Sequence, residues 1–494
     1  MKNTYQKIEK LFTKLSHLSH IERMMIWDEA TMMPPGGGKS RGEALATLKS
    51  IQHNMLLDPK NIELVEEAKN QINLSEWEKS NINLIEKKLK AQACLPVKLV
   101  KELTTAAVES EQAWRQHRTE NNWTGFLPYL EKTFSLVKES AQLRSETLEL
   151  DCYDVLIDEY SPGLTQHFID PIFNELKNIL PPMIKKICDK QSNNAIIIPE
   201  GPFDITKQQQ LGKELMKSIG FDFNRGRLDI SHHPFCGGVP DDVRITTRYR
   251  NDEFISAMLG VCHETGHALY EQNLPEQWHH QPVGQALGMT VHESQSLIIE
   301  MQACRNREFI QFFSKKLETH FGNHKALQAE NLYKLMTKVK PNLIRVDADE
   351  VTYPLHVILR YEIERDLLNN KISIQDLPEI WDSKMISYLG ISTKDNYKDG
   401  VMQDVHWPAG TFGYFPAYTI GRLMAAQFYK SALKVYPEIN NNLRSGNFSK
   451  LVNWLDVNIH KAASSNNFQS LLKNISGEHL NPKYFLDHVE NKYG

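Results

Sequence analysis

The chain has 494 residues, of which 41% are hydrophobic and 24% charged, a composition typical of globular proteins. A formal net charge of −4 gives no basic excess for binding nucleic acid or an anionic membrane, so neither is expected as a partner. The six cysteines include no C-x-x-C pair and are sparse for this length. They argue against a disulfide framework and predict a reducing, cytoplasmic location.

Helical periodicity dominates the chain. Residues 1–24 are amphipathic and lack the continuous apolar core of a signal peptide, and similar i, i+3, i+4 spacing recurs in residues 75–95 and 331–344. No run approaches the roughly 18 apolar residues that a membrane-spanning helix needs. Proline and glycine clusters predict helix breaks at residues 34–38, 161–163, 181–182, 200–202 and 236–238. None is a long linker, so one domain over residues 1–494 is predicted.

Strand patterns are confined to the middle of the chain. Residues 195–199 form a short β-branched run, and residues 242–250 alternate between two faces. Val243 and Ile245 share one face of this second strand, while Arg244 and Arg248 share the polar face. The sequence therefore predicts a small β-sheet within a mainly α-helical body.

A metal-binding motif follows this strand. Residues 261–272 read VCHETGHALYEQ, which has the H-E-x-x-H form. His263 and His267 are one helical turn apart, about 6 Å along the axis, so both imidazoles can reach one Zn²⁺. Glu264 points too far round to share the metal easily but lies close to any water that the metal holds. Gly266 leaves room for a substrate or for a close-packed strand.

A third ligand is expected from the next helix. The motif helix is predicted to start after an N-cap at Asn251 or Asp252 and to end near Pro275. The stretch VHESQS, residues 291–296, lies in a second amphipathic helix with Glu293 near its start. A catalytic zinc site needs three protein ligands and one open position. Glu293 therefore completes a predicted His₂Glu site, a ligand set that also accepts Co²⁺ and other first-row ions.

Several longer motifs make the sequence recognisable, and the chain resembles the carboxypeptidase Taq family of zinc metallocarboxypeptidases over nearly its whole length. The motifs occur in the family's order: WDEATMMPPGGGKSRGE (27–43), HPF (233–235), DVRITTRY (242–249), HETGHA (263–268), HESQS (292–296), IRVDADEVTYPLH (344–356), GVMQDVHW (400–407) and GYFPAY (413–418).

The resemblance implies a single metallocarboxypeptidase domain with a nearly all-helical fold and a deep groove, similar to neurolysin and angiotensin-converting enzyme. It implies zinc ligands at His263, His267 and Glu293, with Glu264 as the general base. It also implies a homodimer that removes single C-terminal residues from peptides with broad specificity, but poorly where proline is last.

The stretch QDVHWPAGTFGYFPAY offers groups for the oxyanion of the reaction. The order His-x-Pro followed by Tyr is similar to a stretch with that role in angiotensin-converting enzyme. His406 and Tyr418 are the expected donors, with Tyr414 as a close competitor for Tyr418. The alternative is a structural loop rich in aromatic residues.

A carboxypeptidase must hold a free carboxylate, and the planar guanidinium of arginine suits that anion. Arg345 is the first candidate, because the resemblance places its motif and GVMQDVHW at a closed end of the groove. The alternatives are that Arg345 limits the length of the substrate at that end, or that it makes an internal ion pair with Asp347, Asp349 or Glu350. Arg244 and Arg248 are weaker candidates, since strand arginines are usually surface or ion-pair residues.

Other histidines have structural explanations. His233 and His292 are expected to be hydrogen-bonded scaffold near the site rather than ligands, because the zinc already has three partners. His279 and His280 are expected to be solvated in a polar loop. The N-terminal motif with Trp27, Asp28, Met32 and Met33 is interpreted as a wall or lid of the groove.

Three functions remain open from the sequence. The first is a zinc carboxypeptidase, and the second is an endo-acting zinc oligopeptidase, since the wider architecture serves both. A cation for the free carboxylate and a closed groove end would separate them. The third is a non-catalytic helical binding protein, which would have lost Glu264 before the metal ligands.

Overall fold

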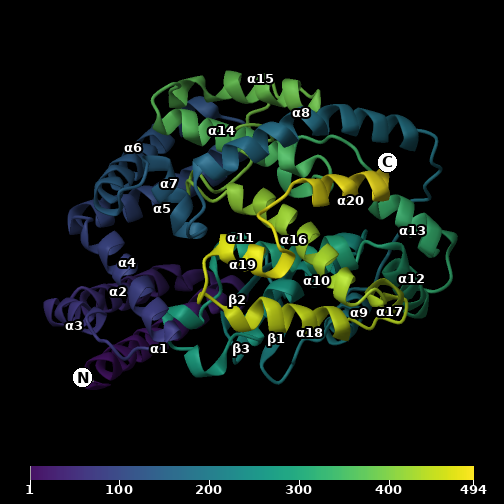
Figure 1. Cartoon of the computed structure of the whole chain (residues 1–494). Helices are drawn as coiled ribbons and strands as arrows, with labels where there is room; N and C mark the ends of the chain where they lie inside the picture. The colour runs from purple at the N-terminus through teal and green to yellow at the C-terminus, as the bar shows by residue number, and fades with distance from the viewer. Residues whose placement is uncertain (1) are drawn as a thin grey trace.

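The computed structural model describes residues 2–494, which are mostly helical as predicted (Figure 1). The α-helices are α1 (Lys2–Thr31), α2 (Gly38–Leu56), α3 (Pro59–Lys69), α4 (Glu76–Ala93), α5 (Val97–Thr119), α6 (Trp123–Leu148), α7 (Cys152–Tyr160), α8 (Gln166–Gln191), α9 (Ile205–Ile219), α10 (Ile255–Gln272), α11 (Gly288–Leu297), α12 (Arg307–Phe321), α13 (Ala329–Met336), α14 (Tyr353–Leu368), α15 (Leu377–Leu389), α16 (Pro416–Val435), α17 (Ile439–Leu443), α18 (Ser449–Asn458), α19 (Phe468–Ser476) and α20 (Lys483–Tyr493). A π-helix, η4 (Ile298–Ala303), continues α11.

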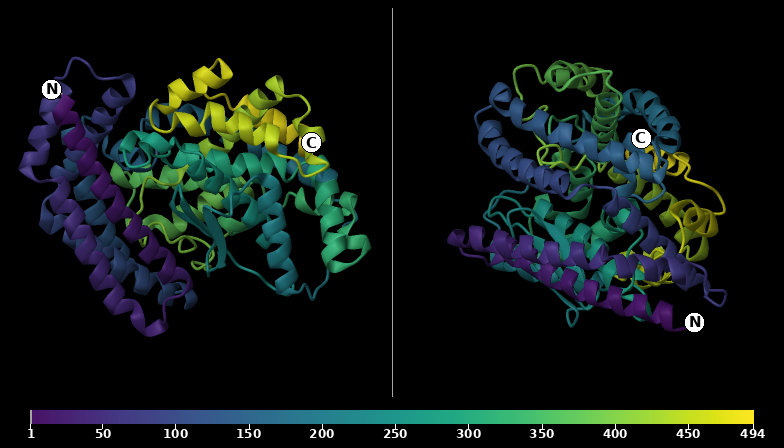
Figure 2. Two further views of the ribbon diagram at one scale, coloured as in Figure 1. Left: turned by 90° about the horizontal axis from the view of Figure 1, so that it is seen from below. Right: turned by 90° about the vertical axis from the view of Figure 1, so that its left-hand side faces the viewer.

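Helices α1 to α4 pack around a small apolar core of their own. Tyr5, Ile8 and Phe12 of α1 are buried there, as the amphipathic N-terminal pattern predicts. Ser75 and Glu78 form a capping box that starts α4. Figure 2 shows α1 and α2 running side by side along one edge of the molecule.

The main core extends from α6 to α20. Its centre is α16, which is buried around most of its circumference and packs closely against α11. Helix α14 is similarly buried and packs against both α8 and α16. These central helices carry or support most of the predicted site residues. One domain over residues 1–494 stays a prediction.

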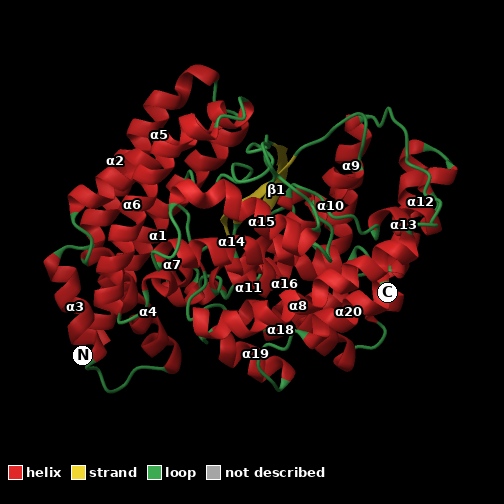
Figure 3. Ribbon diagram, turned by 90° about the horizontal axis from the view of Figure 1, so that it is seen from above, coloured by secondary structure: helices red, strands yellow, loops and turns green. Residues whose placement is uncertain are grey.

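A three-stranded sheet lies beside α10, as predicted. It is small compared with the helices that surround it (Figure 3). Its strands are β1 (Gly226–Ile230), β2 (Phe235–Val239) and β3 (Asp242–Thr247), in the order β1-β3-β2. Strand β1 pairs with β3 in parallel, and β2 pairs with β3 antiparallel. Val243 and Ile245 of β3 are fully buried against Val261 and Ala268 of α10. The alternating pattern thus identified the strand and its core face, although the strand ends at Thr247 and not at residue 250 as predicted.

Two predictions about irregular segments are wrong. Residues 195–199 form no strand, because the side chain of Asn331 binds both the N–H and the C=O of Ile197, at 2.8 Å each, in place of a neighbouring strand. The glycines at 237–238 lie within β2 rather than at a break. Gly238 has φ +90°, a conformation that glycine adopts at no steric cost.

Two predicted helix boundaries are also wrong. Helix α8 runs through Pro181 and Pro182 without a break, since Leu180, Ile184 and Ile187 hold its apolar face in the core. The helix expected over residues 331–344 ends at Met336 instead. The hydroxyl of Thr337 there binds back to the carbonyl of Tyr333 at 2.6 Å.

All six cysteines are free, in agreement with the prediction of no disulfide framework. Among the helices of residues 2–494, none combines the length and the apolar character required to cross a bilayer.

Candidate active site

The motif helix α10 forms the floor of the candidate site. It spans Ile255–Gln272 and has Phe254 as its N-cap, in place of Asn251 or Asp252. The Asp252 carboxylate is held by Arg250, at 2.5 Å, and so does not cap the helix. The helix ends at Gln272, three residues before Pro275, in agreement with the prediction that this proline marks its end.

Gly266 fixes how α10 meets α11. A Cβ at this position would lie 2.5 Å from the backbone oxygen of Gln295 and 2.6 Å from the Cα of Ser296. The space next to Gly266 therefore holds the backbone of α11, neither a strand nor a substrate. This close crossing brings Glu293 of α11 over the histidines of α10.

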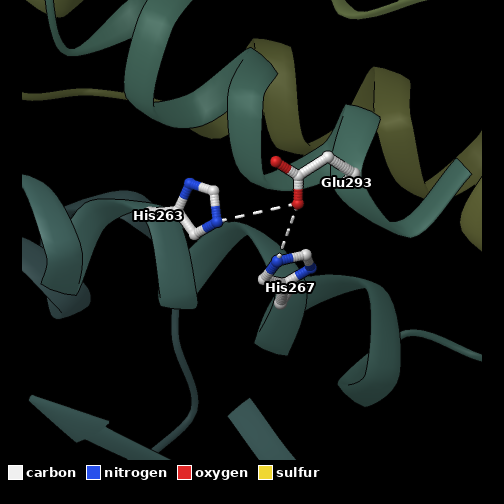
Figure 4. Close-up of side chains that lie close together, drawn as sticks. All are labelled: His263, His267 and Glu293. Atoms are coloured by element: carbon white, nitrogen blue, oxygen red, sulfur yellow. Dashed lines mark ion pairs between the residues drawn. The ribbon is translucent and has the colours of Figure 1, made fainter. Parts of the chain in front are cut away.

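His263, His267 and Glu293 converge in the geometry expected of a metal site (Figure 4). Glu293 Oε2 lies 3.8 Å from His263 Nε2 and 3.5 Å from His267 Nε2. One ligand atom from each residue lies within 4.8 Å of the other two. Two imidazole nitrogens and a carboxylate oxygen fit a first-row divalent cation with one position left open.

A second carboxylate fixes the orientation of His263. Its Nδ1 lies 3.0 Å from Oε2 of Glu300 on the π-helix η4, and Arg305 binds the other Glu300 oxygen at 2.7 Å. Because Arg305 holds this carboxylate ionised, Nδ1 is the donor, and Nε2 faces Glu293 as the nitrogen that can bind a cation once it has lost its proton. Burial lowers the pKa of His263, but Glu293 and Glu300 outweigh it and raise that pKa to about 10, so a cation must displace a proton here.

His267 is oriented through a neighbouring histidine. His267 Nδ1 lies 2.6 Å from Nδ1 of His292, whose Nε2 lies 2.9 Å from a carboxylate oxygen of Glu271. If Nε2–H of His292 donates to Glu271, then Nδ1 of His292 accepts the proton donated by His267. That arrangement leaves the Nε2 lone pair of His267 free for a metal. Burial lowers the pKa of His267 to about 4, which favours the neutral ligand.

Glu264 lies next to the metal ligands but is not one of them. It is buried, and burial raises the pKa of its carboxyl to about 7, although the positive charge of His263 opposes the shift. A carboxyl with a pKa near neutrality can both accept and return a proton at working pH.

Two aromatic hydroxyls and a histidine lie along α16 and the segment before it. His406 Nε2 lies 3.1 Å from the Tyr418 hydroxyl. One turn after Tyr418, Gly421 packs so closely on α11 that its Cβ would lie 3.0 Å from that of Glu293. Tyr414 lies beside Tyr418, with ring centroids 5.2 Å apart. The predicted donors are therefore brought together on the Glu293 side of the site.

Arg345 makes an internal ion pair, but not with any acid predicted for it. Its Nε and Nη2 donate to Oδ1 of Asp404 at 3.0 and 2.8 Å, and Nη1 donates to the Tyr353 hydroxyl at 2.6 Å. Asp404 also binds the fully buried Arg360, at 2.6 Å. The sequence reasoning missed both residues, although Asp404 lies in the GVMQDVHW motif.

The three acids named as partners of Arg345 have other surroundings. Asp349 accepts hydrogen bonds from Val351 and Thr352 and so shapes the turn before α14. Glu350 is fully buried and binds the C-terminal helix α20, through His488, Lys492 and Tyr493 at 2.6 to 3.0 Å. No ion pair of Asp347 occurs among residues 2–494.

Other predicted residues have mixed outcomes. His292 is hydrogen-bonded next to the metal site, as expected, whereas the ring of His233 is exposed. The side chain of His279 is only 9% exposed and hydrogen-bonds to the carbonyl of Leu274 at 3.0 Å, so the expectation that it is solvated was wrong. Trp27 packs α1 against the sheet.

The ring of Trp27 contacts the side chains of two arginines on the strands of the sheet. The guanidinium of Arg244 lies 4.5 Å from the Trp27 ring centroid and that of Arg227 lies 5.2 Å from it. Arg244 also pairs with Asp242 at 2.5 Å. These contacts agree with the structural explanation of Arg244 rather than with carboxylate binding.

The chain matches the model of the carboxypeptidase Taq (M32) metallopeptidase family over residues 7–493, and it belongs to that family. It is therefore a metallocarboxypeptidase. It is 34% identical to thermostable carboxypeptidase 1 of Thermus thermophilus and 34% identical to carboxypeptidase 1 of Bacillus subtilis, each match covering 99% of this chain and 98% of the relative.

Solved structures agree with this assignment. Metallocarboxypeptidase 1 of Trypanosoma cruzi superimposes with a TM-score of 0.98 at 39% identity, over 100% of both chains. An M32 carboxypeptidase from Deinococcus radiodurans gives a TM-score of 0.95 at 30% identity, over 100% of this chain and 99% of the other. The mainly helical carboxypeptidase fold is confirmed, while the likeness to neurolysin and angiotensin-converting enzyme stays a prediction.

Proposed function

We propose that the protein is a zinc-dependent carboxypeptidase that releases single C-terminal residues from peptides, with broad specificity and poor release of proline. The observation that carries the proposal is the convergence of His263, His267 and Glu293 beside the buried Glu264. When bound there, a divalent cation polarises the substrate carbonyl and lowers the pKa of water. The ligand set suits Zn²⁺ and accepts Co²⁺ as a substitute.

Glu264 is the proposed general base. Its carboxylate accepts a proton from the attacking water and returns that proton to the amine of the departing residue. Its raised pKa keeps the proton affinity of this carboxyl close to that required for both transfers. Glu264 is only 8% exposed, so little bulk water competes for the proton.

Tyr418 and His406 are the proposed donors to the oxyanion. Burial, followed by the charge of Arg345, lowers the pKa of His406 to about 3, so the imidazole is neutral and donates through one ring nitrogen. The Tyr418 hydroxyl stays protonated because burial raises its pKa. Tyr414 is near enough to assist in binding the substrate.

Arg345 is the proposed partner of the substrate's terminal carboxylate. It forms one buried cluster with Arg360 and Asp404, which together carry two positive charges and one negative. His356 and His406 beside them add no charge, since burial lowers the pKa of each to about 3. A buried cluster with net charge +1 is stabilised by one anion, and a terminal carboxylate supplies it.

Two further properties belong to the proposal. The free state of all six cysteines supports a reducing, cytoplasmic location. The homodimer follows from the family resemblance alone, and light scattering in solution tests it.

Mass spectrometry of an N-acetylated decapeptide during digestion tests the proposed function. A carboxypeptidase shortens the peptide one residue at a time from the C-terminus and releases free amino acids. Internal fragments without free amino acids would instead support the endo-acting oligopeptidase.

A further inference from the structure

Glu364 of α14 is a fully buried acid that takes no part in the proposed reaction. Its Oε1 accepts a hydrogen bond from the indole N–H of Trp407 at 2.8 Å. Its Oε2 accepts from the backbone N–H of Gly413 at 3.0 Å and from the Tyr153 hydroxyl at 2.7 Å. All three donors are neutral, and burial raises the pKa of the carboxyl to about 7. Burying such a group is unfavourable, and its three hydrogen bonds offset that cost.

Two of these donors belong to the segment that carries the proposed oxyanion donors. Trp407 directly follows His406, and Gly413 directly precedes Tyr414. Gly413 has φ +90°, and a Cβ there would lie 2.5 Å from the backbone of α7, so the segment is packed directly on that helix. Glu364 thus holds the chain next to both of the residues that the donors adjoin.

The same face of α14 holds the other side of His406. Arg360 lies one helical turn before Glu364 and is also fully buried. Its Nε donates to Oδ2 of Asp404 at 2.6 Å. Asp404 is two residues before His406, and Trp407 is one residue after it. Two oppositely charged side chains of one helix therefore hold the neighbours of His406 on both sides.

The ring of His406 depends on these neighbours for its position. Within residues 2–494, its Nδ1 is buried and has no hydrogen-bond partner. Its Nε2 lies 3.1 Å from the Tyr418 hydroxyl, so this contact joins the two proposed donors to each other rather than to the surrounding fold. The ring also packs on Phe415, with centroids 4.4 Å apart. Packing and the chain held by Glu364 and Arg360 therefore set the position of the imidazole.

We propose that Glu364 is a positioning residue for the reaction and places His406 and Tyr418 where the oxyanion forms. The inference rests on the proposed function, which assigns these two residues as the oxyanion donors. A carboxylate suits the role, because its two oxygens accept several hydrogen bonds and donate none. A glutamine would turn its NH₂ group toward the N–H of either Trp407 or Gly413, whichever way the amide lies. A displacement of about 1 Å in an active site can cost about 100-fold in rate.

Glu364→Gln tests the proposal through catalysis rather than stability. It should lower kcat about 10- to 100-fold, while KM for an N-blocked dipeptide and the bound zinc stay within about twofold of the wild type. The affinity for a tetrahedral phosphonate analogue of the same dipeptide should fall by the same factor as kcat, because the analogue resembles the transition state.

Glu362→Gln is the matched control. Glu362 is buried on the same helix and also accepts three hydrogen bonds, from Lys177, Lys384 and Tyr388 at 2.5 to 2.7 Å. None of these donors belongs to the segment that carries the oxyanion donors. The variant should lose stability but keep the wild-type kcat.

A double variant distinguishes positioning from a general structural defect. In a His406→Ala background, Glu364→Gln should lower kcat only about two- to threefold further, because the group that it positions is already absent. If Glu364→Gln does not fold, Trp407→Phe replaces it. This variant removes the N–H that Glu364 accepts, leaves an aromatic ring in the core, and should show the same fall in kcat.

Four results would overturn the proposal: a wild-type kcat in Glu364→Gln or Trp407→Phe, an equal fall in Glu362→Gln, a matching loss of bound zinc, or the full fall repeated in the double variant. Tyr418→Phe tests the proposed function separately. A wild-type kcat in that variant would mean that the oxyanion donors are wrongly assigned. A large fall there, together with a wild-type kcat in Glu364→Gln, would overturn the positioning role alone.

Discussion

His267 and His292 face each other through their Nδ1 atoms at 2.6 Å, and this contact links a metal ligand to the Glu271 carboxylate. The orientation of the ligand thus depends on a residue that cannot itself bind the same cation. Removing such an outer partner typically costs about 10- to 100-fold in metal affinity or activity.

The first prediction compares the two neighbours in the HESQS motif. Glu293→Ala should abolish tight zinc binding, because it removes a ligand. His292→Ala should keep zinc at saturation but raise the dissociation constant about 10- to 100-fold, measured by competition with a chelator. Equal losses in both variants, or a greater loss for His292→Ala, would exclude the proposed ligand set.

The second prediction concerns the base. Glu264→Gln should leave the bound zinc unchanged and lower kcat by about two to four orders of magnitude, because an amide cannot accept the proton from water. Metal content and kcat are measured on the same preparation. Turnover near the wild-type rate would remove Glu264 from the mechanism.

The third prediction separates the two tyrosines. Tyr418→Phe should lower kcat about 10²- to 10³-fold with little change in KM, since the lost donor acts on the transition state. Tyr414→Phe should have a much smaller effect on kcat. The reverse order would assign the oxyanion donor to Tyr414.

Local patterns were sufficient to predict much of this site. The positions of His263 and His267 follow from helical periodicity, and the core face of β3 follows from alternation. Each of these features depends on residues close together in the chain.

The missed features depend on contacts between distant segments. Arg345 and Asp404 are 59 residues apart, and nothing in either motif indicates which acid faces the arginine. Glu271 lies one turn beyond His267, so its position could be predicted, but its partner on α11 could not. That contact exists because Gly266 allows the two helices to cross closely.

The fourth prediction tests this crossing. Gly266→Ala should destabilise the protein by about 1–3 kcal/mol, because the added methyl group meets the backbone of α11. Gly42→Ala is the matched control, since Gly42 lies in α2 and a Cβ there would meet nothing within 4 Å. The control should stabilise by about 0.5–1 kcal/mol, because alanine is the better helix former. Thermal unfolding of both variants measures the difference, and equal shifts would show that the close crossing is unimportant.

The last prediction is the preference for a free C-terminus. If the cluster of Arg345, Arg360 and Asp404 needs one anion, an amidated peptide leaves a buried positive charge unpaired. This costs about 3–5 kcal/mol, or about two to four orders of magnitude in kcat/KM. Arg345→Ala should lose activity on the free acid and so remove most of the preference.

The most direct measurement compares an N-blocked dipeptide with its C-terminal amide, using the zinc-loaded wild-type enzyme. We predict rapid hydrolysis of the free acid and a kcat/KM at least about 100-fold lower for the amide. Equal hydrolysis of acid and amide would contradict the proposed carboxylate site and favour an endo-acting oligopeptidase.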